Sequence, residues 1–255
     1  MSKIYTQILC GLVTFNVYLP MAHATESLPN TNDITPLTSS FVMTLSGGSA
    51  WESAGQTQTL TLAPGMQKTY TANEPTNTLI QGELFLGIQT PLTKILQGQL
   101  GLAFGSTSNA TLSGDIWDDA DPEFDNYTYK YQLRHKEIAL KGKLLGDWGW
   151  GFMPWVSASM GVGYNRAYSF TNTPTIYEAL PSSDYAGNTT TAFTYTLGIG
   201  IQRALTQHWQ MGAGYEFSDW GKSELGLTDG QTTNNSLSLS HVYTHAFLLN
   251  LTFIA

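Results

Sequence analysis

The last run of the chain alternates strictly between apolar and polar side chains. Such a period of two predicts a β-strand with one apolar face and one polar face. A strand of this kind that ended as a free sheet edge would invite aggregation, whereas pairing with the first strand removes the edge. We therefore expect the last run to close a barrel. Its apolar parity consists of Phe247, Leu249, Leu251 and Phe253.

Seven earlier runs alternate in the same way, and the connections between the eight runs are long and short in turn. This arrangement is typical of outer-membrane barrels, whose apolar parity faces lipid. The pattern predicts an all-β fold: an eight-stranded antiparallel up-and-down transmembrane β-barrel with short periplasmic turns and four long external loops. A soluble barrel closed around a ligand is the alternative, which the polar, glycine-rich opposite parity disfavours. The expected strands cover about 40–51, 80–89, 96–104, 127–145, 152–168, 193–201, 209–217 and 237–255.

One expected strand changes parity along its length. In 127–145 the apolar residues are odd-numbered as far as Leu133 and even-numbered from Ile138. One extra residue inserted between Arg134 and Glu137, a β-bulge, would keep all of them on one outer face. We therefore predict a bulge at this point.

Aromatic residues cluster near both ends of the expected strands. Amphipathic rings favour the two interfaces of a membrane, so two aromatic belts are expected. Trp148, Trp150 and Trp209 belong to the short-turn end. Trp51, Tyr127, Tyr129, Tyr164, Trp220 and Tyr243 belong to the long-loop end.

Residues 1–24 are interpreted as a secretory signal peptide. Lys3 precedes an apolar run that is too short to span a bilayer as a helix, and Ala22 and Ala24 frame an A-x-A cleavage site. Residues 25–39 are polar and are expected to form a flexible periplasmic lead before the barrel domain at 40–255. The only cysteine, Cys10, lies within the signal peptide, which excludes disulfides and thiol chemistry in the mature chain.

Charged residues make up only 12% of the chain, about half the usual share of a soluble domain. The formal net charge is −8, so we expect no binding to nucleic acid. No motif indicates a cofactor, and none is expected.

With these features the chain resembles the small eight-stranded outer-membrane barrels, such as the OmpA-type transmembrane domain and the opacity proteins. The resemblance covers nearly the whole mature chain. It rests on the segment Gly214–Gly221 before the last loop and on the aromatic-ended closing strand, although Ile254 and Ala255 follow Phe253. The resemblance implies a location in the bacterial outer membrane, with both termini periplasmic and the long loops extracellular. It also implies a lumen plugged by acidic and basic side chains.

Strand parity places five charged residues inside the expected barrel. The interior of an eight-stranded barrel is just wide enough for side chains to fill, and buried charges there have to be paired or hydrated. We expect Lys141, and as an alternative also Lys143, to pair with Glu83 or Glu216. A gated small pore through the same residues is the competing interpretation. The predicted lumen network is Glu83, Glu137, Lys141, Lys143 and Glu216.

Six acidic residues gather between Asp115 and Asp125. Clustered carboxylates favour hard cations such as calcium, but Phe124 and Lys130 stand where a calcium loop requires glycine and glutamate. A solvated acidic loop is the preferred interpretation, and no metal site is predicted.

The last expected strand carries Ser240, His241 and His245, which raises the hypothesis of a lipid A-modifying enzyme. A hydroxyl needs an adjacent base to act as a nucleophile, yet neighbouring residues of a strand point to opposite faces. We therefore predict no catalytic residues and no enzymatic activity.

The function expected from the sequence is a structural or surface-interaction role, adhesin-like, with a plugged polar lumen. A narrow porin or a channel resembling the OmpW type is the alternative. Expected partners are outer-membrane lipid and lipopolysaccharide, the barrel-assembly machinery, and a host or cell-surface ligand contacted through the external loops.

Overall fold

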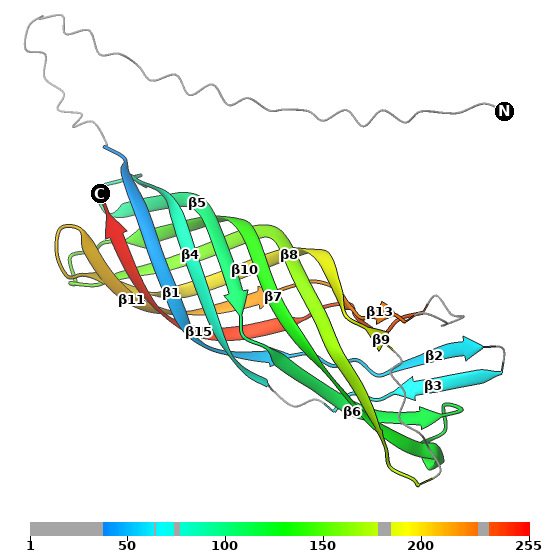
Figure 1. The fold of residues 1–255 in the computed structure, drawn as a ribbon. Helices are drawn as coiled ribbons and strands as arrows, with labels where there is room; N and C mark the ends of the chain where they lie inside the picture. The colour runs from blue at the N-terminus through cyan, green and yellow to red at the C-terminus, as the bar shows by residue number, and fades with distance from the viewer. Residues whose placement is uncertain (1–37, 64, 74–76, 178–184, 229–234) are drawn as a thin grey trace, which may run out of the picture. The chain divides into compact units, whose positions relative to one another are not determined.

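The computed structural model describes residues 38–63, 65–73, 77–177, 185–228 and 235–255. Eight of its strands form a closed antiparallel ring (Figure 1). The expected signal peptide with Ala22 and Ala24, and positions 25–37 of the expected lead, lie outside the described residues.

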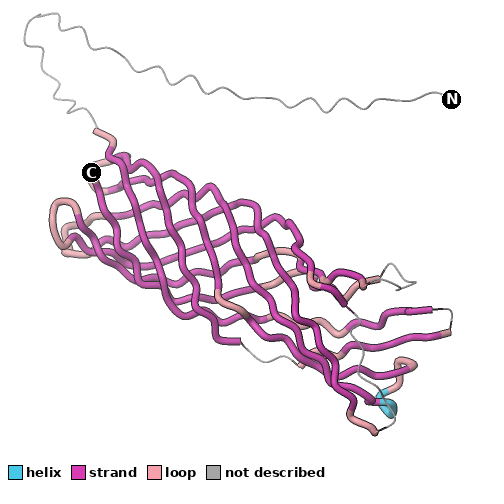
Figure 2. The backbone as a smooth tube through the Cα atoms, viewed as in Figure 1, coloured by secondary structure: helices cyan, strands magenta, loops and turns pink. Residues whose placement is uncertain are grey.

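The ring confirms the predicted eight-stranded antiparallel barrel. Each strand pairs with the next one along the ring, and the last strand pairs with the first. The tilted strands follow one another around the barrel wall (Figure 2). The ring strands are β1 (Ser40–Ser53), β4 (Asn77–Pro91), β5 (Leu96–Thr107), β7 (Asp125–Gly146), β8 (Met153–Pro174), β10 (Asn188–Ala204), β11 (Trp209–Asp219) and β15 (Tyr243–Ile254).

The long connections contain additional strands. Three of them continue the ring's own sheet from β7, in the order β7–β6–β3–β2, and prolong the barrel wall at its long-loop end (Figure 1). Two small pairs, β12–β14 and β9–β13, lie in the other long connections. The added elements are β2 (Gln58–Ala63), β3 (Met66–Tyr70), β6 (Ala110–Asp118), the short helix η1 (Pro122–Phe124), β9 (Tyr185–Ala186), β12 (Ser223–Glu224), β13 (Gly226–Leu227) and β14 (Ser238–Leu239).

An apolar belt surrounds the outside of the ring. Every ring strand contributes exposed large apolar side chains from alternate positions, while the intervening positions face the interior. Among the described residues, no helix has the length and apolar character needed to span a membrane. One belt residue from each ring strand, in chain order, is Leu45, Ile88, Leu100, Leu140, Met160, Leu197, Met211 and Leu249.

The predicted bulge between Arg134 and Glu137 is wrong. The parity of β7 stays constant, so Tyr129, Tyr131 and Leu133 are buried on the same inner side as Glu137. Apolar side chains therefore point outward within the belt but inward beyond it. Where water surrounds a sheet, burial of apolar area drives such side chains into the interior. We call the part of the barrel beyond Lys136, toward the long loops, the outer extension.

The bulge lies on β8. Opposite β7, the register shifts between Lys130 and Gln132. Ser169 adopts a left-handed φ of 57° at this point, and Phe170 rather than Ser169 is buried. This extra residue turns Phe170 into the interior of the outer extension.

Two members of the expected aromatic belts lie inside the barrel. Trp220 is fully buried and Tyr129 is almost fully buried. Both follow the inverted pattern of the outer extension. Tyr164 and Trp209 are exposed on the outer face as expected.

Candidate functional site

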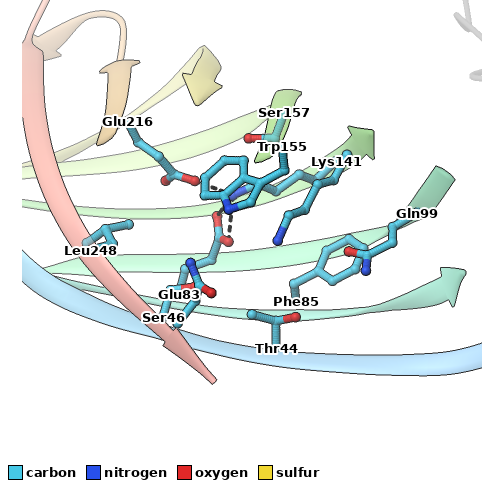
Figure 3. A pocket seen from close by; sticks show the side chains of 12 residues that line it. Thr44, Ser46, Glu83, Phe85, Gln99, Lys141, Trp155, Ser157, Glu216 and Leu248 are labelled. Carbon is cyan, nitrogen blue, oxygen red and sulfur yellow. Dashed lines mark hydrogen bonds and ion pairs between the residues drawn. The ribbon is translucent and has the colours of Figure 1, made fainter. Parts of the chain in front are cut away.

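The lumen within the belt is organised around Lys141. Its Nζ atom donates hydrogen bonds to Glu83 Oε1 at 2.7 Å and Oε2 at 2.9 Å, and to Glu216 Oε1 at 2.7 Å. All three side chains are buried. They come from β7, β4 and β11, so this lumen cage, Lys141 with Glu83 and Glu216, ties distant parts of the wall together (Figure 3).

Lys143 makes different contacts. Its Nζ donates to Gln202 Oε1 at 2.6 Å and lies 4.5 Å from the centre of the Trp155 ring. Lys143 thus has a neutral partner and an aromatic face, rather than the carboxylate that the sequence offered as an alternative. A cation over an indole face gains favourable electrostatic energy.

Trp155 also fills part of the lumen, although it was not among the predicted lumen residues. It is buried beside the lumen cage (Figure 3). A Cβ atom added at Gly200 would lie 2.5 Å from the Trp155 ring, and one added at Gly214 would lie 2.3 Å from it. Glycines on two neighbouring strands therefore make the space that the indole occupies. This pairing of inward glycines was the sequence signal that could have revealed Trp155.

Little free space remains around the lumen cage. The cavity there has a volume of about 20 Å³, which is room for about one water molecule. Glu137, the fifth predicted lumen residue, is buried in the same interior, and its side chain lies against Gly105 on β5. The structure thus places all five predicted charged residues in the lumen.

A second buried polar group lies above the lumen cage, toward the long-loop end. His135 Nε2 is 3.1 Å from Glu52 Oε2, and His135 Nδ1 is 2.8 Å from Asn165 Oδ1. The Asn165 amide nitrogen donates to the backbone oxygens of Trp220 and Lys222, so its Oδ1 faces the histidine. His135 Nδ1 therefore carries a proton. Sequence parity did not reveal this group, because the predicted bulge shifted the parity of β7.

Aromatic side chains close the interior beyond His135. The Trp220 indole stacks on His135 at 5.3 Å and donates from Nε1 to Thr244 Oγ1. Five further rings pack against one another in the outer extension, with neighbouring ring centres 5.1–6.5 Å apart. We call the set the aromatic plug: Trp220, Tyr70, Tyr129, Tyr131, Phe170 and Tyr185.

Burial in the aromatic plug changes the pKa of two tyrosine hydroxyls. Burial raises the pKa of Tyr129, and the nearby Asp115 adds to the effect. Burial likewise raises the pKa of Tyr131, with smaller contributions from Tyr129 and Glu52. Both phenols therefore stay neutral over the physiological pH range.

His241, just before β15, and His245, within it, contact groups other than Ser240. His241 Nδ1 is 2.9 Å from Asp219 Oδ2, whereas the Ser240 hydroxyl donates to Gln56. His245 Nδ1 is 2.5 Å from the Tyr215 hydroxyl on the outer face. A histidine held by an acid is thus present, but the neighbouring serine points to another partner.

Two acidic residues of the second long connection, Asp118 and Asp121, have separate partners. Asp118 accepts from Asn126 and lies 3.5 Å from Lys68, while Asp121 caps η1 by accepting from the Glu123 backbone nitrogen. Within the described part of the chain, no three acidic, histidine or cysteine side chains converge as they would around a metal ion.

Several solved structures are similar to this chain at low sequence identity. Neisserial surface protein A is 12% identical over 85% of this chain and 98% of its own, with a TM-score of 0.43. The outer membrane protease OmpT from Escherichia coli is 10% identical over 90% of this chain and 99% of its own, with a TM-score of 0.45. OprG from Pseudomonas aeruginosa is 11% identical over 84% of this chain and 95% of its own, with a TM-score of 0.41. None of them indicates a function for this chain.

The sequence matches no curated protein. The model of the outer membrane protein beta-barrel domain, in contrast, matches residues 40–250, which run from the start of β1 into β15. This match spans the ring, the lumen cage and the outer extension. The chain therefore belongs to the outer membrane protein beta-barrel domain family, whose members lie in the bacterial outer membrane.

Proposed function

We propose that this protein is a closed outer-membrane scaffold whose outer extension contacts a partner at the cell surface. The observation that carries the proposal is the filled interior: the lumen cage, the His135 group and the aromatic plug follow one another along the barrel. A barrel built for passage would leave a continuous path, whereas this interior leaves room for about one water molecule around the cage.

The proposal includes an orientation. In bacterial outer-membrane barrels the short turns face the periplasm and the long loops face outward. By this rule both chain termini lie in the periplasm, and the outer extension projects from the cell. Export through cleavage after Ala24, and recognition of the closing strand by the barrel-assembly machinery, are part of the same proposal.

The tip of the outer extension offers a contact point. Phe124, Ile176 and Tyr177 are all exposed, Tyr177 at 99%, although they lie far beyond the belt. The backbone nitrogen of Thr175 donates to Asn126, which joins the end of β8 to the start of β7. Exposed aromatic and aliphatic side chains outside the lipid favour contact with another macromolecule.

Conductance tests the closed lumen. Refolded protein from Thr25 onward in a planar bilayer is expected to show no stable current steps. The variant carrying Glu83→Ala and Lys141→Ala removes two of the three side chains of the lumen cage but leaves the aromatic plug, so it should also stay closed. Stable steps from the unaltered protein would instead support the narrow channel.

Surface binding tests the outer extension. Cells that display the unaltered barrel are expected to adhere to host cells or to neighbouring bacteria, and the Phe124→Ala, Tyr177→Ala variant should lose most of this adhesion. Trp150→Ala is the matched control, because this exposed aromatic residue lies at the short-turn end. Equal adhesion by both variants, at equal surface levels, would contradict the proposed contact point.

A further inference from the structure

Three cations stand together on the outer face of the barrel where the belt ends. Arg134 and Arg166 are directly opposite each other on β7 and β8. Lys136 is opposite Tyr164, one same-face step closer to the belt. All three cationic side chains are exposed.

This arrangement is unfavourable by itself. Like charges at directly opposite positions of an antiparallel pair destabilise the sheet. Within the described residues, none of the three cations forms a salt bridge, and the chain as a whole carries a net charge of −8. No carboxylate of the described chain therefore neutralises the cluster at ion-pair distance, which leaves it open to an external anion.

The outward-facing residue pairs between the cluster and the belt indicate what kind of anion the cluster binds. Outward pairs along β7 and β8 are Leu140 with Met160, then Ile138 with Val162, before the pair of Lys136 and Tyr164. Same-face neighbours along a strand are about 7 Å apart. One molecule lying along this ladder would meet apolar side chains first and cations next. That order matches an acyl chain followed by a charged headgroup, and it favours a lipid-borne anion over a soluble one.

The surroundings suit phosphate in particular. Arginine offers a planar fork of donors that fits phosphate oxygens, and two such forks face outward here. The Arg166 guanidinium lies 5.0 Å from the Tyr168 ring, which supports its position. Hydroxyl side chains flank the cations, since Thr189 is paired with Arg166 on β10 and Ser106 with Lys136 on β5.

We infer that Arg134, Lys136 and Arg166 bind the phosphate groups of a phosphorylated glycolipid in the outer leaflet, of the lipopolysaccharide type. The inference rests on the orientation given under the proposed function, because only that orientation sets the cluster in the outer leaflet. It assigns a lipid site to one sector of the barrel wall, distinct from the tip around Phe124 and Tyr177.

The direct test is binding of bisphosphorylated lipid A to the folded protein in detergent, counted by native mass spectrometry. Each cation near an anionic lipid surface contributes enough that Arg134→Gln with Arg166→Gln should weaken binding about 30-fold, and Lys136→Gln alone about 5-fold. Arg203→Gln removes an exposed cation at the short-turn end and should leave binding unchanged. An equal loss in Arg203→Gln, equal binding of dephosphorylated lipid A, or equally strong binding of inorganic pyrophosphate would overturn the inference.

Thermal stability supplies a second readout, because the Arg166→Gln substitution should have opposite effects on Tm without and with lipid A. In lipid-free detergent, Arg166→Gln relieves the repulsion from Arg134, so its Tm should equal or exceed that of the unaltered protein. With lipid A present, the unaltered protein should gain more in Tm than the variant does. A variant that is less stable in both conditions would show that Arg166 serves the fold rather than the lipid. Adhesion through the tip is measured separately, so failure of either idea leaves the other standing.

Discussion

The belt and the outer extension share long strands such as β7, but the apolar side chains of these strands face outward in the belt and inward in the outer extension. Within the belt, β7 points Leu140 outward and Lys141 inward, whereas in the outer extension it points Lys130 outward and Tyr131 inward. The belt therefore has an apolar exterior and a charged core, while the outer extension is organised like a water-soluble protein. The side-chain alternation is the same throughout, and the solvent around each part determines which side is apolar.

The largest effect is expected at the charged core of the belt. Lys141→Ala leaves Glu83 and Glu216 buried without their cation, which should lower the free energy of unfolding by about 3–5 kcal/mol. Urea unfolding in lipid vesicles measures this loss. Adding Glu83→Gln and Glu216→Gln to Lys141→Met should restore most of the stability. If this neutral triple variant is as unstable as Lys141→Ala, buried charge is not the cause.

Adding a charge to the outer face tests directly whether the belt and the outer extension face different solvents. Leu249 is 69% exposed within the belt, so Leu249→Arg should destabilise the inserted barrel by about 2–4 kcal/mol. Gln132→Arg makes the corresponding outward change in the outer extension, where water surrounds the wall, and should alter stability by no more than about 0.5 kcal/mol. Equal costs for the two variants would mean that both regions face the same solvent.

The close packing of the Trp155 indole against Gly214 predicts a loss of stability of intermediate size. In Gly214→Ala, the new methyl group would overlap the indole, and overpacking of this kind should cost about 1–3 kcal/mol. Gly142→Ala is the matched control, because a Cβ there meets no atom within 4 Å. Unfolding of both variants, followed by tryptophan fluorescence, should show a loss only for Gly214→Ala.

The smallest effect is a pH dependence in the outer extension. Hydrogen bonds from Lys222 and Ser236 lower the pKa of Glu224 below its usual value of 4.5. The ionised carboxylate therefore stabilises the fold above that value, and the contribution disappears as the pH falls through the lowered pKa. Because Glu224 is partly exposed, the contribution should be below about 0.5 kcal/mol.

Unfolding of the unaltered protein and of Glu224→Gln should therefore differ at about pH 6 and converge once the pH falls below the lowered pKa of Glu224. A difference that grows as the pH falls would have the wrong sign for this carboxylate.

The ring could be predicted from two independent patterns. Apolar and polar residues alternate along each strand, and long and short connections alternate between strands. Parity also assigned Glu83, Lys141 and Glu216 to one interior, since all three lie within the belt, where apolar residues do face outward. The same rule failed at Tyr131, because a pattern of alternation does not say which solvent surrounds it. Tyr131 and Leu133 were assigned outward, and a bulge was then needed to reconcile them with Ile138.

Other parts of the interior could not be predicted from the residue pattern of any single strand. The space that Trp155 occupies is created by Gly200 and Gly214, which belong to two other strands. The hydrogen bonds of His135 likewise depend on Glu52 and Asn165, which are distant in the sequence. Such groups become visible only when the register of neighbouring strands is known.

The seam between β1 and β15 has a consequence for biogenesis. It joins residues from opposite ends of the ring, such as Val42 with Ile254 and Ser53 with Tyr243. β1 cannot complete its backbone pairing until Tyr243–Ile254 has been synthesised, so the ring stays open until then. During that interval the chain carries open strand edges that are prone to aggregation. The pairing that closes the ring thus spans the largest sequence separation in the wall, and the barrel is complete only once these two distant strands have met.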